Sequence, residues 1–334
     1  MERFVIGAAI LAAVGIAAGS YFGHAVSDEH GFRFEINGES EAGGGGGRPA
    51  SAAATPYAAH ELRVRNAVAV LNVVPEDRTD IVLEIANPGR LAMPTARLDG
   101  DALIIDGGIA HRRIHDCRRV GGAYEVSVGG VGDVTLAQMP VITVHVPRAV
   151  HLAAGGAVKS TIGASASADL SFAGCGDASV ADVAGALKIE NDGSGGAAAG
   201  AAQSVEINSA GSGDTSLGVI AGKMVVALAG SGGVTAASAA GPLDVSIAGS
   251  GDVTINGGAM SEAKISIAGS GDVSVGGSVQ ALNVSIAGSG DVNVTGAAKD
   301  VDVSILGSGD VSIGSVTGTI RKSVLGSGDV TVGR

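Results

Sequence analysis

A four-residue phrase, Gly-Ser-Gly-Asp, recurs through the C-terminal half of the chain at nearly constant spacing. Weaker copies read Gly-Cys-Gly-Asp or Gly-Ser-Gly-Gly, and with them the fourth position falls at residues 177, 196, 214, 233, 252, 272, 291, 310 and 329. The spacing is 18 to 20 residues and is most often 19. A fixed period of this size over nine copies predicts a solenoid, in which each repeat packs only against its neighbours.

Each repeat alternates apolar and small polar residues, as in residues 243–255, Leu-Asp-Val-Ser-Ile-Ala-Gly-Ser-Gly-Asp-Val-Thr-Ile. Because successive side chains of a strand point to opposite faces, Leu243, Val245 and Ile247 share the inner face and Ser246 lies outside. With 56 glycines and only 2% aromatic residues, the chain suits a narrow interior filled by Val, Ile, Leu and Ala. The pattern predicts an all-β solenoid with rungs of about 19 residues, roughly 40 Å long in its regular part.

The glycines of the phrase are expected to form a sharp corner, because glycine adopts backbone angles that other residues avoid. The predicted corner residues of the regular repeats are Gly249, Gly251, Gly269, Gly271, Gly288, Gly290, Gly307 and Gly309. The aspartate that follows each corner is interpreted as an acceptor for nearby backbone N–H groups, as is common for aspartate in turns.

The repeated Gly-Ser-Gly-Asp-Val units, preceded by the strand Ile-Thr-Val-His-Val-Pro at residues 142–147, resemble the head GIN domain family. That family is described as putative auto-transporter adhesins, and the resemblance covers roughly residues 60–334. It implies a single-stranded, right-handed parallel β-helix. It brings no catalytic residues to carry over. The missing aspartate at Gly196 and Gly233 departs from the repeated unit.

Four segments follow from these patterns. Residues 1–26 contain an uncharged run at 4–23, with Arg3 before it and Asp28 and Glu29 after it, which predicts a cleaved signal peptide or a retained transmembrane anchor. Residues 27–56 are a Gly/Ala/Ser-rich flexible linker, residues 57–146 an irregular β-strand cap region, and residues 147–334 the regular β-helix. The protein is therefore expected to be exported to the periplasm or the cell surface, with membrane contact through the N-terminal segment.

Charge and repetition limit the chemistry. A formal net charge of −12 argues against nucleic acid as a partner. The regular aspartates would form a column in which neighbours about 4.8 Å apart repel by roughly 0.9 kcal/mol in water, and a cation such as Ca²⁺ would relieve this. However, the repeat lacks the Ca²⁺-binding nonapeptide pattern. The weak metal candidates are Asp252, Asp272, Asp291, Asp310 and Asp329.

Catalysis is not predicted, and neither is a cofactor. The aspartates occupy the same place in every repeat, which suits a structural role, whereas an active site should break the repeat at one place. The chain after His151 contains no histidine. The favoured function is therefore an exported cell-envelope protein with a binding, adhesion or structural display role. A polysaccharide-processing β-helix enzyme and a Ca²⁺-binding solenoid are the alternatives.

Residues 111–119, His-Arg-Arg-Ile-His-Asp-Cys-Arg-Arg, form the most basic stretch of the chain. Its His-x₃-His-x-Cys spacing is compatible with a metal, but four arginines would repel a cation, so a solvated basic loop is favoured. Such a loop suits contact with an anionic envelope polymer, and the expected partners are an envelope polysaccharide or a surface protein. Cys117 and Cys175 are either free or paired, since an exported protein meets an oxidising compartment.

The last repeat differs from the others. Aligned with residues 301–305, it places Lys322 in a column of Val and Ile, with Arg321 beside it. An inward-pointing charge on an edge strand guards against edge-to-edge association. Arg321 and Lys322 are therefore predicted to cap this end of the rod.

Overall fold

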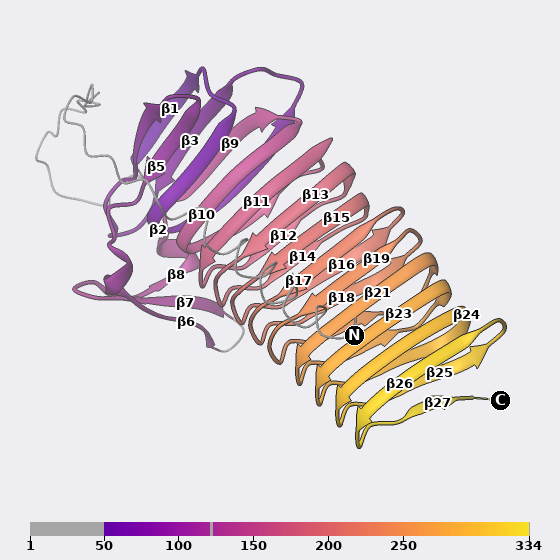
Figure 1. Ribbon diagram of the computed structural model, residues 1–334. Helices are drawn as coiled ribbons and strands as arrows, with labels where there is room; N and C mark the ends of the chain where they lie inside the picture. Colours follow the sequence, from indigo (N-terminus) through magenta and orange to yellow (C-terminus); the bar gives the residue numbers. More distant parts are fainter. Residues whose placement is uncertain (1–49, 121–122, 334) are drawn as a thin grey trace, which may run out of the picture.

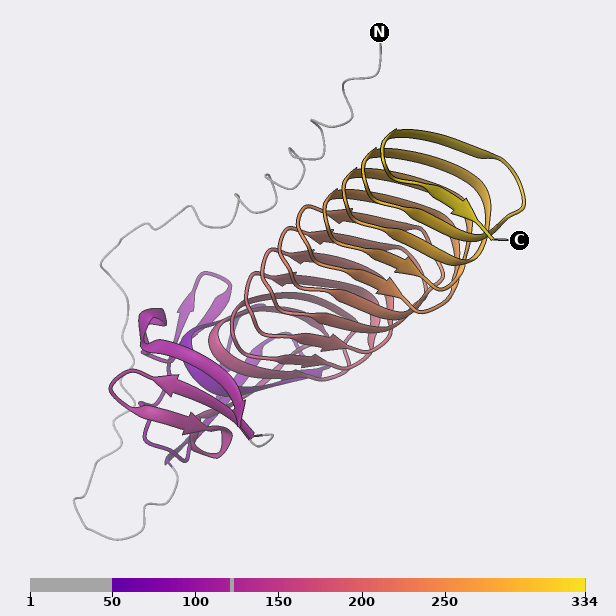
Figure 2. The same ribbon diagram turned by 90° about the horizontal axis from the view of Figure 1, so that it is seen from below.

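The computed structural model describes residues 50–120 and 123–333, which form a rod of stacked β-rungs with a cap at one end (Figure 1). Figure 2 shows the rungs as successive turns of one coil. The predicted signal or anchor segment lies outside the described residues. Among the residues that are described, no helix is long and apolar enough to cross a membrane. The all-β solenoid is confirmed, and the right-handed sense of the coil stays a prediction.

One side of the rod is a parallel sheet to which each rung contributes one strand, here called the long face. From β10 onward its ten strands are β10 Ala149–Ile162, β11 Ser167–Gly174, β13 Val183–Asn191, β15 Ala202–Ser209, β17 Met224–Leu228, β19 Leu243–Ile247, β21 Ala259–Gly269, β23 Ser278–Gly288, β24 Val292–Gly307 and β26 Ile320–Gly326. Neighbours pair in parallel and in register, as Val245 does with Ile265 and Ile265 with Val284. The predicted period of about 19 residues therefore corresponds to one rung of the solenoid.

After each Gly-Ser-Gly corner the chain enters a second parallel sheet of shorter strands. These are β12 Ala178–Val180, β14 Ala197–Ala199, β16 Thr215–Ile220, β18 Val234–Ala239, β20 Val253–Ile255, β22 Val273–Val275, β25 Val311–Val316 and β27 Val330–Val332, with the first residues of β24 between β22 and β25. A third short side, which includes Ala239, Met260 and Val279, leads back to the long face.

The interior is one continuous apolar cluster along the rod. In the regular rungs Ile247, Ile267, Ile286 and Ile305 stack in one inward column, each no more than 2% exposed. Burying an isoleucine side chain fully contributes about 2 kcal/mol. The outward column beside it is Ser246, Ser266, Ser285, Ser304 and Ser323, in the register expected from the sequence.

The solenoid begins earlier in the chain than residue 147. Strand β2 Glu61–Glu76 pairs in parallel with β10 along most of its length, with Leu62 beside Leu152 and Val73 beside Ile162. It therefore forms a full rung, although about 90 residues separate it from its neighbour. The chain between them builds the cap and a small separate sheet. This rung has no Gly-Ser-Gly-Asp phrase, so the repeat could not reveal it.

The cap closes the N-terminal end of the rod with mixed strand pairing. Its strands are β1 Ala50–Tyr57, β3 Ile81–Asn87, β4 Thr95–Asp99, β5 Ala102–Asp106 and β9 Val141–Pro147. Strands β5 and β9 continue the parallel stacking onto β2, whereas β1–β3, β3–β9 and β4–β5 are antiparallel.

Strand β1 lies mostly within the stretch that composition assigns to the flexible linker. Residues 50–56 pair with β3 instead of forming a tether. The physical reason is the C-terminal part of the strand, where Tyr57 packs against the main core. The linker prediction therefore holds at most for residues that lie outside those described.

Candidate functional site

A small antiparallel sheet stands beside the first rungs and breaks the regularity of the rod (Figures 1 and 2). Its strands are β6 Ile114–Val120, β7 Ala123–Val128 and β8 Gly132–Thr135, flanked by the short 3₁₀ turns η1 His111–Arg113 and η2 Leu136–Gln138. We call residues 111–120 and 123–138 the flap. The stretch interpreted as a solvated basic loop is thus η1 and strand β6.

The flap has an apolar underside that packs onto the rod. Its contacts with the rod form a second core, separate from the main one, that joins Val68 of β2 and Ala157 of β10 to Tyr124, Val126 and Val134 of the flap. Val126 is fully buried. The flap is therefore fixed over one particular part of the rod, beside β2 and β10.

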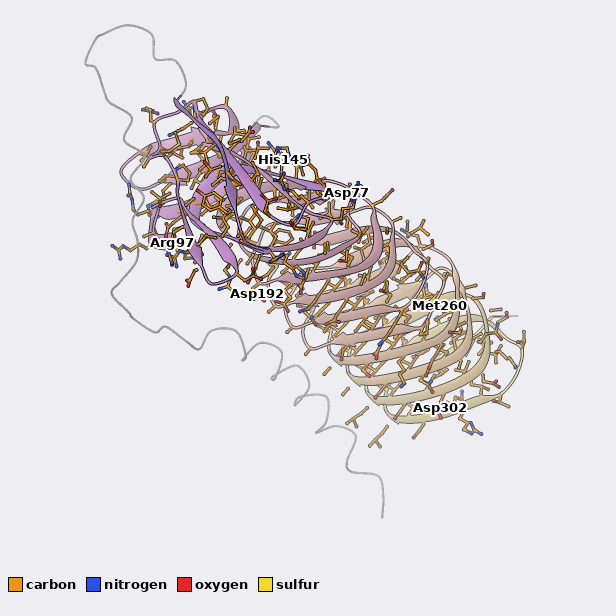
Figure 3. All side chains as sticks on the ribbon, turned by 90° about the horizontal axis from the view of Figure 1, so that it is seen from above. Asp77, Arg97, His145, Asp192, Met260 and Asp302 are labelled. Atoms are coloured by element: carbon orange, nitrogen blue, oxygen red, sulfur yellow. A yellow bond between two sulfur atoms is a disulfide. The ribbon has the colours of Figure 1, made fainter. Side chains whose placement is uncertain are left out.

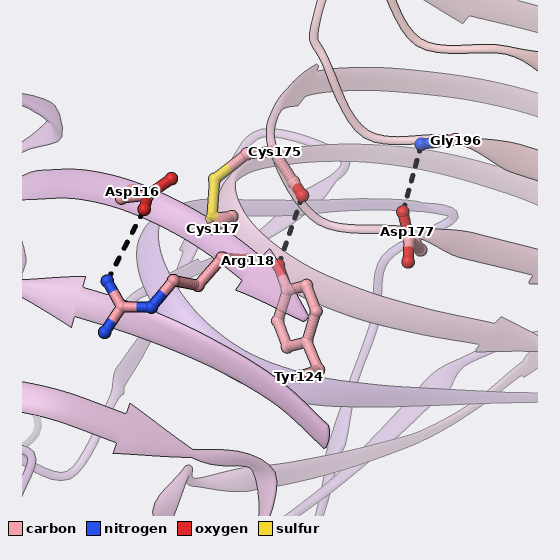
Figure 4. The surroundings of a disulfide bond; sticks show 7 residues. All are labelled: Asp116, Cys117, Arg118, Tyr124, Cys175, Asp177 and Gly196. Carbon is pink, nitrogen blue, oxygen red and sulfur yellow. Dashed lines mark hydrogen bonds and ion pairs between the residues drawn. A yellow bond between two sulfur atoms is a disulfide. The ribbon is translucent and has the colours of Figure 1, made fainter. Parts of the chain in front are cut away.

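A disulfide bond between Cys117 and Cys175 joins β6 to the corner that follows β11 (Figure 4). The pairing that the sequence left open is therefore present. Beside it the Tyr124 hydroxyl donates a hydrogen bond of 3.1 Å to the Cys175 carbonyl oxygen. Cys175 occupies the serine position of the Gly-Ser-Gly corner, so the flap is fastened to a corner of the repeat itself.

Between the flap and the long face runs a groove of about 1100 Å³. One wall is formed by His111 and Ile114 and by the segment 115–117 of β6. The floor comes from five successive rungs, at residues 173–175, at 190 and 192–194, at 208–212, at 227 and 229, and at 246, and Gly156 of β10 borders it next to the cap. This groove, which we call the flap groove, lies where the outward columns of the long face change composition.

The change is visible position by position. Upstream of Ser246 the outward serine column continues as Ala227, Asn208 and Glu190. The next outward column is alanine at 287, 268, 248, 229 and 210, and then becomes Asp192. Figure 3 shows Asp192 on the same side of the rod as Asp302, well away from Asp77 and His145. In these two columns acidic and amide groups thus stand beneath the flap in place of serine and alanine.

The inner column changes at the same rungs. Ile247 and Leu228 are followed toward the cap by Ser209 and Asn191, which are buried. The Asn191 amide donates a 3.0 Å hydrogen bond to the Gly195 carbonyl and accepts one of 3.2 Å from the Gly193 N–H. The Ser209 hydroxyl donates to the Asn191 carbonyl oxygen. These bonds fasten the corner that carries Asp192 from the inside.

Ion pairs and hydrogen bonds engage three cations on the elements around the groove. Lys188 lies 2.7 Å from a Glu190 carboxylate oxygen, and Arg118 lies 2.7 Å from an Asp133 oxygen. Arg113 donates two hydrogen bonds to the Gly129 carbonyl. Asp192 has no side-chain hydrogen bond or ion pair within the described part of the chain, and burial, with a smaller contribution from Glu190, raises the pKa of its carboxyl.

Comparison with known proteins identifies the family of the chain. The family model described as "Putative auto-transporter adhesin, head GIN domain" matches residues 128–259 and 226–333, which together cover more than half of the chain. The chain belongs to this family. Its description supports a binding or adhesion role outside the cytoplasm. A search of functionally curated proteins gives no match.

Solved structures similar to this GIN domain protein include two putative adhesins. The one from Parabacteroides merdae is 13% identical, with a TM-score of 0.43, and the match covers 86% of this chain and 97% of that one. The one from Bacteroides fragilis is 18% identical, with a TM-score of 0.30 and coverages of 85% and 97%. A putative lipid binding protein from Parabacteroides distasonis is 14% identical, with a TM-score of 0.40 and coverages of 86% and 98%.

The aspartate column of the GIN domain forms a hydrogen-bonded ladder. The carboxylates of Asp252, Asp272, Asp291 and Asp310 each accept a 2.8 Å bond from the backbone N–H at the same position one rung further on. Asp329 accepts from the N–H of the following residue. The acceptor role expected from the sequence thus connects rungs rather than closing each turn. Among the described residues, no three metal-ligating side chains gather closely enough to hold a metal ion.

The corner glycines are stacked directly on one another. At Gly269, Gly288 and Gly307 the angle φ is 150°, 147° and 142°, and a Cβ would meet the carbonyl oxygen of the corner glycine one rung below. The second glycine of the corner, such as Gly290, has the same close neighbour. Glycine is therefore needed here for close approach of the backbones as well as for the turn.

At the far end of the rod, Lys322 pairs with Val303 and Arg321 with Asp302. This is the alignment on which the cap prediction depends. Strand β26, which carries both residues, is exposed along its whole length. The capping role itself stays a prediction.

Proposed function

We propose that this GIN domain protein is an exported envelope protein that adheres to other molecules through the flap groove, without catalysis. The observation that carries the proposal is that the outward columns of the long face change composition where the flap stands beside them, and that a groove lies there. The flap covers it, the disulfide fixes its wall, and polar residues replace serine and alanine on its floor. Family membership supports the same role.

The remaining rungs fit a scaffold that displays this site. Ten long-face strands at about 4.8 Å spacing give a rod of roughly 45 Å. We propose that residues 1–26 direct export and connect the rod to a membrane, and that an envelope polysaccharide or a surface protein is the partner.

The flap groove also meets the condition set for an enzyme, since it is a polar cluster that breaks the repeat. Glu190 and Asp192 lie two residues apart on the same outward face, with His111 and His115 in the opposite wall. The binding role is favoured because Lys188 holds Glu190 in an ion pair. A turnover screen with polysaccharide substrates, on the native protein and on Asp192→Asn, tests the alternative, and activity lost in that variant would replace the adhesion proposal.

The direct test fills the groove. Ala210 lies in the floor and points outward, so Ala210→Trp should occupy the groove without disturbing the core. Ala287→Trp makes the same change in the same column, several rungs away on β23. Purified full-length proteins are compared for binding to surfaces coated with cell-wall polysaccharide, mucin glycoprotein or collagen. We expect at least a tenfold loss of binding for Ala210→Trp alone, and equal binding by both variants would contradict the proposal.

A further inference from the structure

The shape of the flap groove suits an extended chain. Its floor crosses five rungs, which at about 4.8 Å per rung span about 19 Å. An extended polypeptide advances about 3.3 Å per residue, so some six residues fit this length. Ala210, Ala227 and Ala229 line the middle of the floor, and such small side chains let a ligand backbone come close.

The chemistry of the lining favours a polypeptide over a saccharide. Among the described residues that line the groove, none is Phe, Tyr or Trp, so the flat apolar surfaces on which sugar rings stack are missing there. The polar groups on the floor include the Asn208 amide and the hydroxyls of Ser194 and Ser212. These groups can hydrogen bond to a peptide backbone in either direction, because each both donates and accepts.

The charge of the lining is negative. Asp116, Glu190 and Asp192 face the groove together with His111 and His115, and no arginine or lysine is among the lining residues that the structure describes. Two cations beside lining residues are already engaged, Lys188 with Glu190 and Arg118 with Asp133. Of these three carboxylates, Asp192 is the one that has no side-chain partner among the described residues.

We propose that the flap groove binds an extended polypeptide segment of about six residues that carries lysine or arginine, with Asp192 as the principal counter-ion. This inference deepens the adhesion role and depends on it. Asp192 is exposed to solvent on the groove floor, so a ligand cation can reach it and form a partly exposed ion pair there. An anionic polymer does not suit this surface, although the basic composition of residues 111–119 suggests one.

The test titrates the full-length protein with three fluorescent probes. These are a hexapeptide of alternating alanine and lysine, the same peptide with glutamate in place of lysine, and a neutral linear hexasaccharide of glucose. We expect the lysine peptide to bind, and a dipeptide or tetrapeptide of the same pattern to bind more weakly. Asp192→Asn should weaken it about fivefold, in keeping with a partly exposed ion pair. Asp302→Asn removes the same charge from the same face outside the groove and should leave binding unchanged.

The possible contrary results distinguish a failure of the peptide inference from a failure of the adhesion proposal. Equal weakening by Asp192→Asn and Asp302→Asn would overturn the inference, as would stronger binding of the glutamate peptide or the saccharide. If the lysine peptide fails to bind while Ala210→Trp still abolishes attachment to the coated surfaces, the peptide inference is wrong and the adhesion role stands. If Ala210→Trp also has no effect on attachment, both proposals are wrong.

Discussion

The rungs beneath the flap and the rungs beyond it share one backbone but differ in what they carry. From β19 to β24 one outward column repeats serine and the inward column beside it repeats isoleucine. From β11 to β15 the corresponding positions include Glu190, Asn208, Asn191 and Ser209. In this second set, polar side chains occupy inward positions that are apolar in the regular rungs. The comparison teaches that regular positions in this solenoid serve stability and that function is to be sought where they change.

The largest expected effect comes from releasing the flap. In the chain-entropy model, a disulfide across 58 residues contributes about 4 kcal/mol. Replacing Cys117 and Cys175 by serine should therefore free the flap while the regular rungs stay folded. Hydrogen exchange would show loss of amide protection in β6–β8 and none in β21–β24. Equal loss in both regions would mean that the flap and the distant rungs unfold as one unit.

In the regular rungs, the substitution expected to destabilise the fold most is at a corner glycine. Gly288→Ala introduces a Cβ at positive φ against the Gly269 carbonyl, and should destabilise the rod by about 3 kcal/mol. Ser289→Ala changes the exposed middle residue of the same corner and should stay within about 0.5 kcal/mol. Chemical denaturation of the two variants measures the difference. Similar stability of both would show that the corners do not need close backbone contact.

A smaller effect is expected from the aspartate ladder. Asp291→Ala removes the acceptor for the Asp310 N–H and should cost about 1 kcal/mol. Asp291→Asn keeps an acceptor oxygen at this position and should be nearly neutral. Denaturation midpoints separate the two results. Equal losses in both variants would show that the carboxylate charge, and not the hydrogen bond, stabilises the ladder.

Among the smallest expected effects is a gain in stability from replacing a buried polar residue of the interior. Thr215 is buried, its hydroxyl has no hydrogen-bond partner in the described chain, and the two residues stacked beyond it are Val234 and Val253. Thr215→Val should stabilise the protein by about 1 kcal/mol. Thr254→Val, on an outward position, is the matched control and should change little. A destabilised Thr215→Val would mean that the hydroxyl is satisfied within the folded protein.

The fold was predictable because the corner phrase or a weaker copy of it recurs nine times at nearly constant spacing. A period of 19 residues and alternation within residues 243–255 were enough to predict the parallel stacking and the inner and outer columns. Strand β2 was missed because its partner β10 is about 90 residues away and its rung lacks the corner phrase. Its pairing is decided by packing, which local pattern does not reveal.

The candidate site was predictable only in outline. The sequence singles out the basic stretch, but in the structure Arg118 pairs with Asp133, Arg113 bonds to the Gly129 carbonyl, and acidic groups line the groove. Two signals were present in the sequence. Cys175 replaces the serine of a corner, and Glu190 and Asn208 interrupt the serine column. Both become meaningful only when the flap is placed beside them, which depends on contacts between distant residues.

The most direct test of the central claim removes one whole rung from each region of the full-length protein. Deleting residues 273–291 joins Asp272 to Val292 and removes a regular rung, whereas deleting residues 197–214 joins Gly196 to Thr215 and removes Asn208 and Ala210 from the groove floor. Both variants keep the repeat phase and should fold. Binding to the coated surfaces should survive the first deletion and be lost in the second. Equal binding by two folded variants would contradict the account.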